Sequence, residues 1–137
     1  MTQMSRHEER RAALQILFAA VKEVPDDNQM DLNYDLVLRN DAYQAFLPQL
    51  VNGVLATSKE LDENLSKHLA TGWKLDRISR IDLVILRIAA YELTLPEPTP
   101  YKVVVDEAVE LAKEFATKED AQFVNGVLKN YAPENVQ

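Results

Sequence analysis

Residues 49–55 read QLVNGVL and residues 122–128 read QFVNGVL, so the pentapeptide VNGVL occurs twice in a chain of 137 residues. The chain has only 3 glycines, and Gly53 and Gly126 supply one to each copy. A glycine inside a helix costs about 1 kcal/mol relative to alanine. We therefore interpret both glycines as positions where another backbone approaches the helix closely.

A second pair of similar segments precedes the two VNGVL copies. LQILFA at residues 14–19 resembles LRIAAY at residues 86–91, so the same order of segments occurs twice. We infer a single domain over residues 1–137 that consists of two similar helical subdomains packed together. They arose by internal duplication, with approximate halves 1–72 and 73–137.

Apolar residues recur at the spacing of a helix along most of the chain, as Leu14, Leu17, Phe18 and Val21 illustrate. The pattern predicts an all-α protein, and residues 102–105 are the one stretch where a strand is also considered. Pro48 indicates either a kink or a later start of its helix. In the first part of the chain, helices are expected from residue 13 to before Pro25, over 32–38 and over 41–56. A further helix is expected after a capping box at 57–60. The remaining helices are expected over 76–93 with Asp76 as cap, over Tyr101–Phe115, and from the cap Thr117 to about 130.

Composition restricts the classes of function. The net charge is −7, with 47% apolar and 27% charged residues, which is typical of a folded chain. The N-terminus lacks an apolar signal segment and no stretch suits a membrane span, so we expect a cytoplasmic protein without membrane contact. An acidic chain must bind nucleic acid through a local basic patch, and its remaining surface suits a basic protein partner.

Signatures of catalysis are missing from the sequence. There is no cysteine, so thiol catalysis and cysteine metal sites are excluded. His7 and His68 lack the spacing of metal ligands, and three glycines cannot form a phosphate-binding loop. We expect no enzyme activity, no metal and no cofactor.

A basic segment precedes the first apolar stripe. At about 100° per residue, four cationic side chains fall on the arc of that stripe, and Glu8 and Glu9 point elsewhere. The pattern favours a groove lined with positive charge, although a solvated helix end is the alternative. The four residues are Arg6, His7, Arg10 and Arg11.

An aromatic residue begins the apolar part of the last helix. Phe123 follows Lys118 and Gln122, and an aromatic ring beside basic and amide groups can stack a nucleobase. A core position is the alternative reading of Phe123.

Four ordered segments together resemble the NusB family of bacterial transcription antitermination factors. They are RRAALQILFA, DRISRIDLVILRIAAYEL, PYKVVVDEAVELAKEFA and FVNGVLKNYAP. The resemblance covers nearly the whole chain and is strongest from Asp76 to Pro133. It implies an all-helical fold with two helical subdomains, which agrees with the duplicated VNGVL.

The resemblance also implies a function. Such proteins bind the single-stranded boxA sequence of ribosomal RNA leader transcripts together with ribosomal protein S10, also called NusE. They join an antitermination complex on RNA polymerase. The RNA-binding positions of the family map onto Arg6, His7, Arg10, Arg11, Gln15, Phe18, Lys118, Glu119, Gln122 and Phe123. The acidic positions that face S10 map onto Asp76 and Asp82.

Two departures from the family pattern bear on the strength of RNA binding. Glu8 and Glu9 dilute the first basic turn, and a serine common before Phe-Val-Asn-Gly is replaced, with Asp120 and Ala121 nearby. Two alternatives remain: a protein-binding helical scaffold, and a stand-alone relative of the NusB-like domain of ribosomal RNA methyltransferases. Because the chain ends at Gln137, we do not expect a methyltransferase domain. The sequence leaves a monomer and a homodimer both open.

Overall fold

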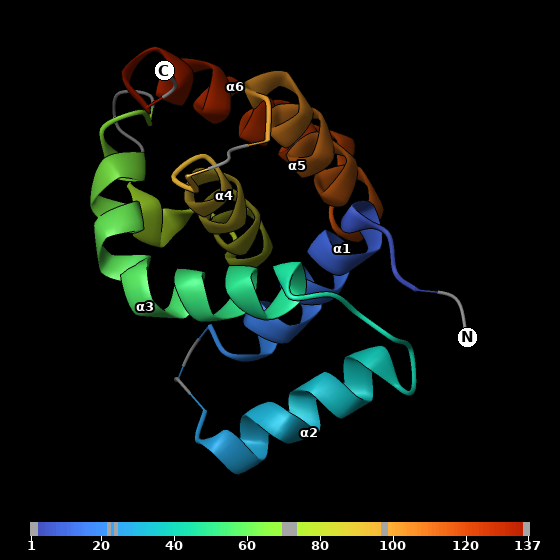
Figure 1. The fold of residues 1–137 in the computed structure, drawn as a ribbon. Coiled ribbons are helices and arrows are strands. Elements are labelled where there is room, and N and C mark those ends of the chain that lie inside the picture. The colour runs from blue at the N-terminus through green and yellow to red at the C-terminus, as the bar shows by residue number, and fades with distance from the viewer. Residues whose placement is uncertain (1–2, 22, 24, 70–73, 97–98, 136–137) are drawn as a thin grey trace. The chain divides into compact units, whose positions relative to one another are not determined.

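A computed structural model describes residues 3–21, 23, 25–69, 74–96 and 99–135 of the chain. Within these ranges the chain is helical, and a single bridge between Gln3 and Ala42 is its one β-type pairing, so the all-α expectation is confirmed (Figure 1). Gly72 and Pro98 lie outside the described ranges. The elements are α1 (Arg6–Ala19), α2 (Asp27–Leu38), α3 (Phe46–Ser66), the 3-10 helix η1 (Leu75–Arg77), α4 (Arg80–Glu92), α5 (Tyr101–Phe115) and α6 (Lys118–Asn135).

Two compact units make up the chain. The first comprises Met1–Ala56 and the second Thr57–Gln137, so the boundary falls within α3. The compact units therefore divide at another point than the expected halves, and the duplication stays a hypothesis.

The third helix differs from the sequence-based expectation. A break with a capping box at residues 57–60 was expected, but α3 continues through these residues to Ser66. This prediction was wrong because Thr, Ser, Lys and Glu all keep their backbone N–H groups and can continue a helix, whereas a proline would have removed a backbone hydrogen bond. Pro48 is the third residue of α3, where a missing N–H leaves no helical hydrogen bond unmade. Of the two readings of Pro48, the later start is therefore correct.

Side chains cap the N-termini of α1 and α2 in the first unit. Ser5 and Glu8 form a capping box: the Glu8 N–H donates to Ser5 Oγ at 3.1 Å and the Ser5 N–H donates to Glu8 Oε1 at 2.9 Å. Asp26 caps α2 by accepting a hydrogen bond from the Gln29 N–H at 2.8 Å. Helix α1 thus starts seven residues earlier than the apolar stripe alone suggested, and it packs against α2 (Figure 1).

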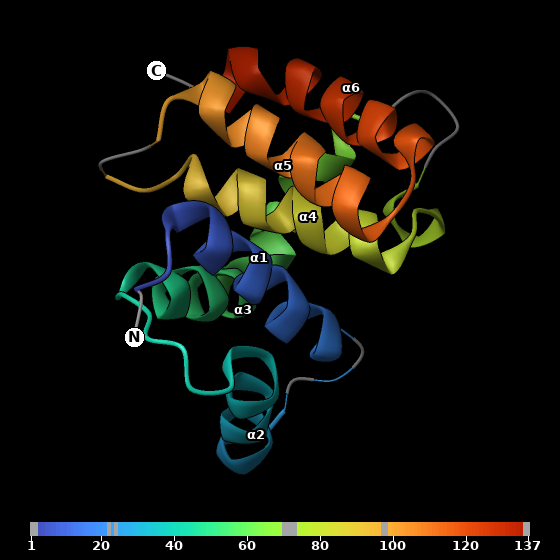
Figure 2. The same ribbon diagram turned by 90° about the vertical axis from the view of Figure 1, so that its right-hand side faces the viewer.

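In the second unit, α4, α5 and α6 lie side by side (Figure 2). Their facing sides carry the buried residues, and the Tyr101 hydroxyl on α5 donates to the Leu128 carbonyl on α6 at 2.9 Å. The expected bounds of α5 are confirmed, with Pro100 as its N-cap; residues 102–105 are therefore helical. No helix in the described part of the chain is long and apolar enough to cross a membrane.

The ends of α4 and α6 correct two expectations. Ser79, not Asp76, caps α4, because Asp76 lies in η1 and Ser79 Oγ accepts from the Asp82 N–H at 3.2 Å. Thr117 caps α6 as expected, and its Oγ1 accepts from the Asp120 N–H at 3.0 Å. Helix α6 runs past the expected stop to Asn135, since a proline near a helix end removes only one hydrogen bond.

A bidentate ion pair joins two helices within the second unit. Arg87 Nε and Nη2 on α4 donate to the two carboxylate oxygens of Asp62 at 2.8 and 2.7 Å. The two side chains are 17% and 28% exposed, so water screens the attraction between their charges only in part. The pair fixes α4 against the C-terminal part of α3.

We expect Asp62→Ala to lower the free energy of unfolding by about 2–3 kcal/mol, because Arg87 then keeps a partly buried charge without its partner. Thermal unfolding measures the change. Glu60→Ala removes an exposed carboxylate from the same helix and is the matched control. Equal melting temperatures for the two variants would contradict a structural role of the pair.

The close-packing interpretation of Gly126 is wrong. Gly126 is exposed on α6, and a Cβ atom added there would have nothing within 4 Å. The open space removes the reason for expecting a clash with a larger residue.

We therefore expect Gly126→Ala to raise the free energy of unfolding by about 0.5–1 kcal/mol, since alanine restricts the unfolded chain more and favours the helix. Chemical denaturation measures this gain. A loss of stability would show that the glycine has a packing role after all.

Candidate nucleic-acid interface

The first turns of α1 divide their charged side chains between a buried and an exposed side. Arg10 is only 4% exposed, whereas Arg6 and Arg11 are exposed. The guanidinium groups of Arg6 and Arg10 lie 4.0 and 5.2 Å from the ring centroid of Phe46, within the range of cation–π attraction. The expectation of one accessible basic arc is therefore wrong for Arg10.

Glu9 is buried, with 1% of its surface exposed, although the sequence suggested that it points away from the apolar side. Its Oε1 accepts a hydrogen bond of 2.8 Å from the Leu47 N–H at the start of α3. A helix leaves its first N–H groups without internal partners, and a carboxylate there is also favoured by the helix dipole. Glu9 thus supplies a side-chain cap from α1, and the same N–H also forms a longer hydrogen bond of 3.3 Å to the Gln44 carbonyl.

An exposed stripe runs along the other side of α1. Its members follow one another at intervals of four, four and three residues, which places them within roughly 80° of one another on the helix. His7 is half-buried, and Phe18 is an exposed large apolar residue. The stripe, His7–Arg11–Gln15–Phe18, contains four of the expected RNA-binding residues.

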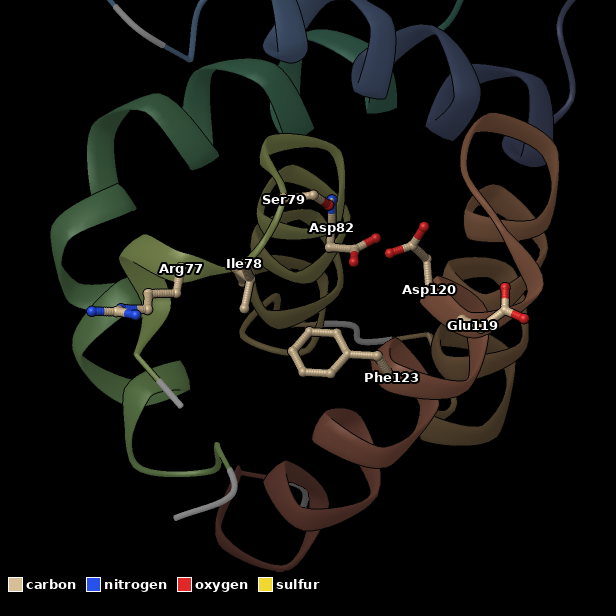
Figure 3. A pocket seen from close by; sticks show the side chains of 7 residues that line it. All are labelled: Arg77, Ile78, Ser79, Asp82, Glu119, Asp120 and Phe123. Atoms are coloured by element: carbon tan, nitrogen blue, oxygen red, sulfur yellow. The ribbon is translucent and has the colours of Figure 1, made fainter. Parts of the chain in front are cut away.

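The other expected RNA-binding residues lie at the start of α6. Lys118, Glu119 and Gln122 are exposed, and Phe123 is half-buried. The Phe123 ring faces a cavity of about 370 Å³ within the second unit (Figure 3). Phe123 is therefore not a fully buried core residue, and its ring can be reached from the cavity. The other lining residues are Arg77, Ile78, Ser79, Asp82, Glu119 and Asp120.

Two carboxyl groups face one another at the edge of this cavity, Asp82 from α4 and Asp120 from α6 (Figure 3). Asp82 is 3% exposed, and its Oδ1 has no hydrogen-bond partner among the described residues. Burial, followed by the hydrogen bond and charge of Asp120, raises the pKa of Asp82 to about 7. Hydrogen bonds from Asp82 and Thr117 lower the pKa of Asp120. Asp82 therefore keeps its proton at pH values at which Asp120 is already ionised.

The two acidic positions expected to face S10 differ in accessibility. Asp76 is exposed in η1, whereas Asp82 is buried beside the cavity. Sequence reasoning did not find the Asp82–Asp120 pair, because the residues are far apart in the chain and nothing local marks them as neighbours. Within the described ranges, no group of three or more His, Asp or Glu side chains could hold a metal ion.

Comparison with known proteins places the chain in a family. The model of the NusB family matches residues 7–133. The chain belongs to the NusB family. It is 44% identical over 130 residues to the transcription antitermination protein NusB of Levilactobacillus brevis, covering 91% of this chain and 90% of that protein. The NusB of Bacillus subtilis is 43% identical over 128 residues, covering 93% and 94%. The role named for these relatives is not an enzymatic one, in agreement with the sequence analysis.

Solved structures show the same fold. NusB of T. maritima superposes with a TM-score of 0.85 at 27% identity, covering 99% of this chain and 96% of that chain. The factor NusB in a crystal structure with NusE and double-stranded RNA gives a TM-score of 0.81 at 22% identity, covering 94% and 96%. Both likenesses confirm the expected fold of this NusB-family chain.

We expect Asp82→Asn to change how stability depends on pH. The folded state holds the Asp82 proton up to about pH 7, whereas an unfolded aspartate releases it near pH 4. Between these values the folded state binds more protons, so this group makes stability fall as pH rises. This contribution lowers the free energy of unfolding by up to about 1.4 kcal/mol per pH unit, and it should be absent in Asp82→Asn.

Denaturation of both proteins between pH 4 and 7 measures the difference. Asp76→Asn removes the same charge at an exposed site and should keep the wild-type pH dependence. Parallel curves for wild type and Asp82→Asn would show that Asp82 is ionised throughout this range.

Proposed function

We propose that this NusB-family chain binds single-stranded boxA RNA of ribosomal RNA leader transcripts, together with ribosomal protein S10, within an antitermination complex on RNA polymerase. The observation that carries the proposal is the exposed His7–Arg11–Gln15–Phe18 stripe on α1. Family membership supports the proposal, because the relatives are named for transcription antitermination. The fold also matches that of a NusB crystallised with NusE and RNA, a likeness that concerns the fold alone. Action on transcripts implies the cytoplasm.

Different side chains have different roles in RNA binding under this proposal. The exposed cations Arg11 and Lys118 contact phosphates, which supply affinity without sequence preference. The Phe123 ring stacks a base, which is favoured for single strands because their bases are unpaired. Gln15 and Gln122 are exposed amides that can form hydrogen bonds with base edges.

The buried members of the basic segment act indirectly. Arg10, together with Arg6, lies against Phe46, and Glu9 caps α3. We assign to Arg10 the positioning of α1 rather than a phosphate contact, because its exposed surface is too small. Arg6 is exposed, so it can contact a phosphate as well as the ring of Phe46.

The acidic surface suits the protein partner. The chain carries a net charge of −7, and S10 is proposed to bind at Asp76 and beside Asp82. Binding of S10 then strengthens RNA binding, and RNA strengthens S10 binding by the same factor. If RNA does not bind with or without S10, a protein-binding scaffold becomes the better description of the chain.

We expect Arg11→Ala to weaken binding of all single-stranded RNA sequences and to reduce the salt dependence of binding. The slope of log K against log salt should become less steep by about 0.7, the value for one phosphate contact on a single strand. Arg10→Ala should lower stability and leave this slope nearly unchanged, since Arg10 is buried. Fluorescence titration of a boxA oligonucleotide at several salt concentrations measures the slopes.

Arg39→Ala is the matched control, because Arg39 is an exposed arginine that follows α2 and lies outside the proposed interface. It should bind RNA as wild type does. An unchanged slope in Arg11→Ala, or an equal change in Arg39→Ala, would contradict the proposed role of the exposed stripe.

A further inference from the structure

A second cavity, of about 440 Å³, lies within the first unit and has no part in the proposed RNA binding. Residues of α2, of the loop after it and of the first turn of α3 line this cavity: Asp31, Tyr34, Asp35, Tyr43 and Pro48. The rings of Tyr34 and Tyr43 have centroids 6.1 Å apart and are tilted by 48°. Two tyrosine side chains and two aspartate side chains therefore border one space.

The two carboxylates at this cavity are exposed and can pair with a cation of a binding partner. Asp31 and Asp35 lie one turn apart on α2, and both are exposed. In the described part of the chain, neither side chain forms a hydrogen bond or ion pair, and Arg39, the nearest cation in sequence, pairs with neither. Helix α2 reads DNQMDLNYDLVL and holds no basic residue, so its surface is negative.

Apolar side chains accompany these charges on α2. Leu36 is 67% exposed and Leu32 47%, and they lie one turn apart on the same side of the helix. Neighbouring exposed leucines on a helix are typical of a surface that another protein covers. Each leucine directly follows one of the two aspartates in sequence, so apolar and acidic side chains are adjacent on the surface.

The combination of tyrosine rings, carboxylates and exposed leucines fits one class of binding partner. A cation beside aromatic rings is attracted by their faces, and arginine is the cation that stacks best on rings while it also pairs with carboxylates. Nucleic acid is disfavoured, because its phosphates would meet Asp31 and Asp35. A basic protein segment that also carries leucines satisfies both the cavity and the exposed apolar surface.

We propose that the α2 surface formed by Asp31, Leu32, Tyr34, Asp35, Leu36 and Tyr43 docks a basic, leucine-bearing helical segment of a protein partner, with an arginine side chain in the cavity beside the two tyrosine rings. The docking surface shares no residue with the exposed stripe of α1 or with the lining of the cavity beside Phe123. It gives the chain a protein contact in addition to those implied by RNA binding.

The test uses the full chain and a synthetic amphipathic peptide of about 14 residues, roughly four helical turns, with leucines and arginines on one face. A twin peptide carries neutral citrulline in place of each arginine. NMR titration should show saturable shifts of the Tyr34 and Tyr43 ring signals with the arginine peptide. The citrulline peptide should bind at least about tenfold more weakly, because it lacks the charge.

Variants of the chain assign the binding to this surface. The double variant Asp31→Asn/Asp35→Asn and the separate variant Leu36→Ser should each weaken binding of the arginine peptide by about tenfold or more. Both changes are at exposed positions, and the backbone spectra report that the fold is kept. Asp41→Asn removes an exposed carboxylate outside the cavity and should bind the peptide as wild type does.

Three results would overturn the proposal. The first is equal binding of the arginine and citrulline peptides, and the second is wild-type affinity in the double variant. The third is a shift of the Tyr34 and Tyr43 signals by a single-stranded RNA oligonucleotide but not by the peptide, which would assign the surface to RNA.

Discussion

The buried hydrogen bond from the Leu47 N–H to the Glu9 carboxylate is the contact on which the arrangement of the first unit depends. It joins residues 38 positions apart, and it gives a hydrogen-bond partner to a buried carboxylate and to an N–H group in the first turn of α3. Once α1 is held in this way, Arg6 and Arg10 lie over Phe46. The rotation of α1 that follows leaves Arg11, with Gln15 and Phe18, facing outward.

The proposed RNA interface is thus a consequence of packing as well as of charge. Arginines one position apart in sequence differ completely in exposure, because Arg10 lies on the side of α1 that contacts Phe46 and Arg11 does not. In the second unit the cavity beside Phe123 has a similar origin. Asp82 and Asp120 are each the third residue of a helix, and the starts of α4 and α6 bring the two together.

Helix existence could be predicted from the sequence wherever apolar spacing or a strong terminator was present, as the bounds of α5 and the Thr117 cap of α6 show. Local pattern failed where a decision depended on distant residues. Residues 57–60 read as a capping box but lie inside α3. Glu9 cannot be distinguished from the exposed Glu8 by sequence, since only the proximity of Leu47 makes its burial favourable. The open space around Gly126 could not be predicted from the sequence either, because a glycine in a helix does not indicate whether another segment packs against it.

The central claim is that the outward side of α1, and not every arginine of the basic segment, meets RNA. Side-chain Nε–Hε NMR spectra of the arginines, recorded as single-stranded boxA RNA is added, test it most directly. The account predicts a large shift of the Arg11 signal with little change at Arg10, which lies over Phe46. A shift of Arg10 equal to or greater than that of Arg11, in a chain that keeps its fold, would contradict it.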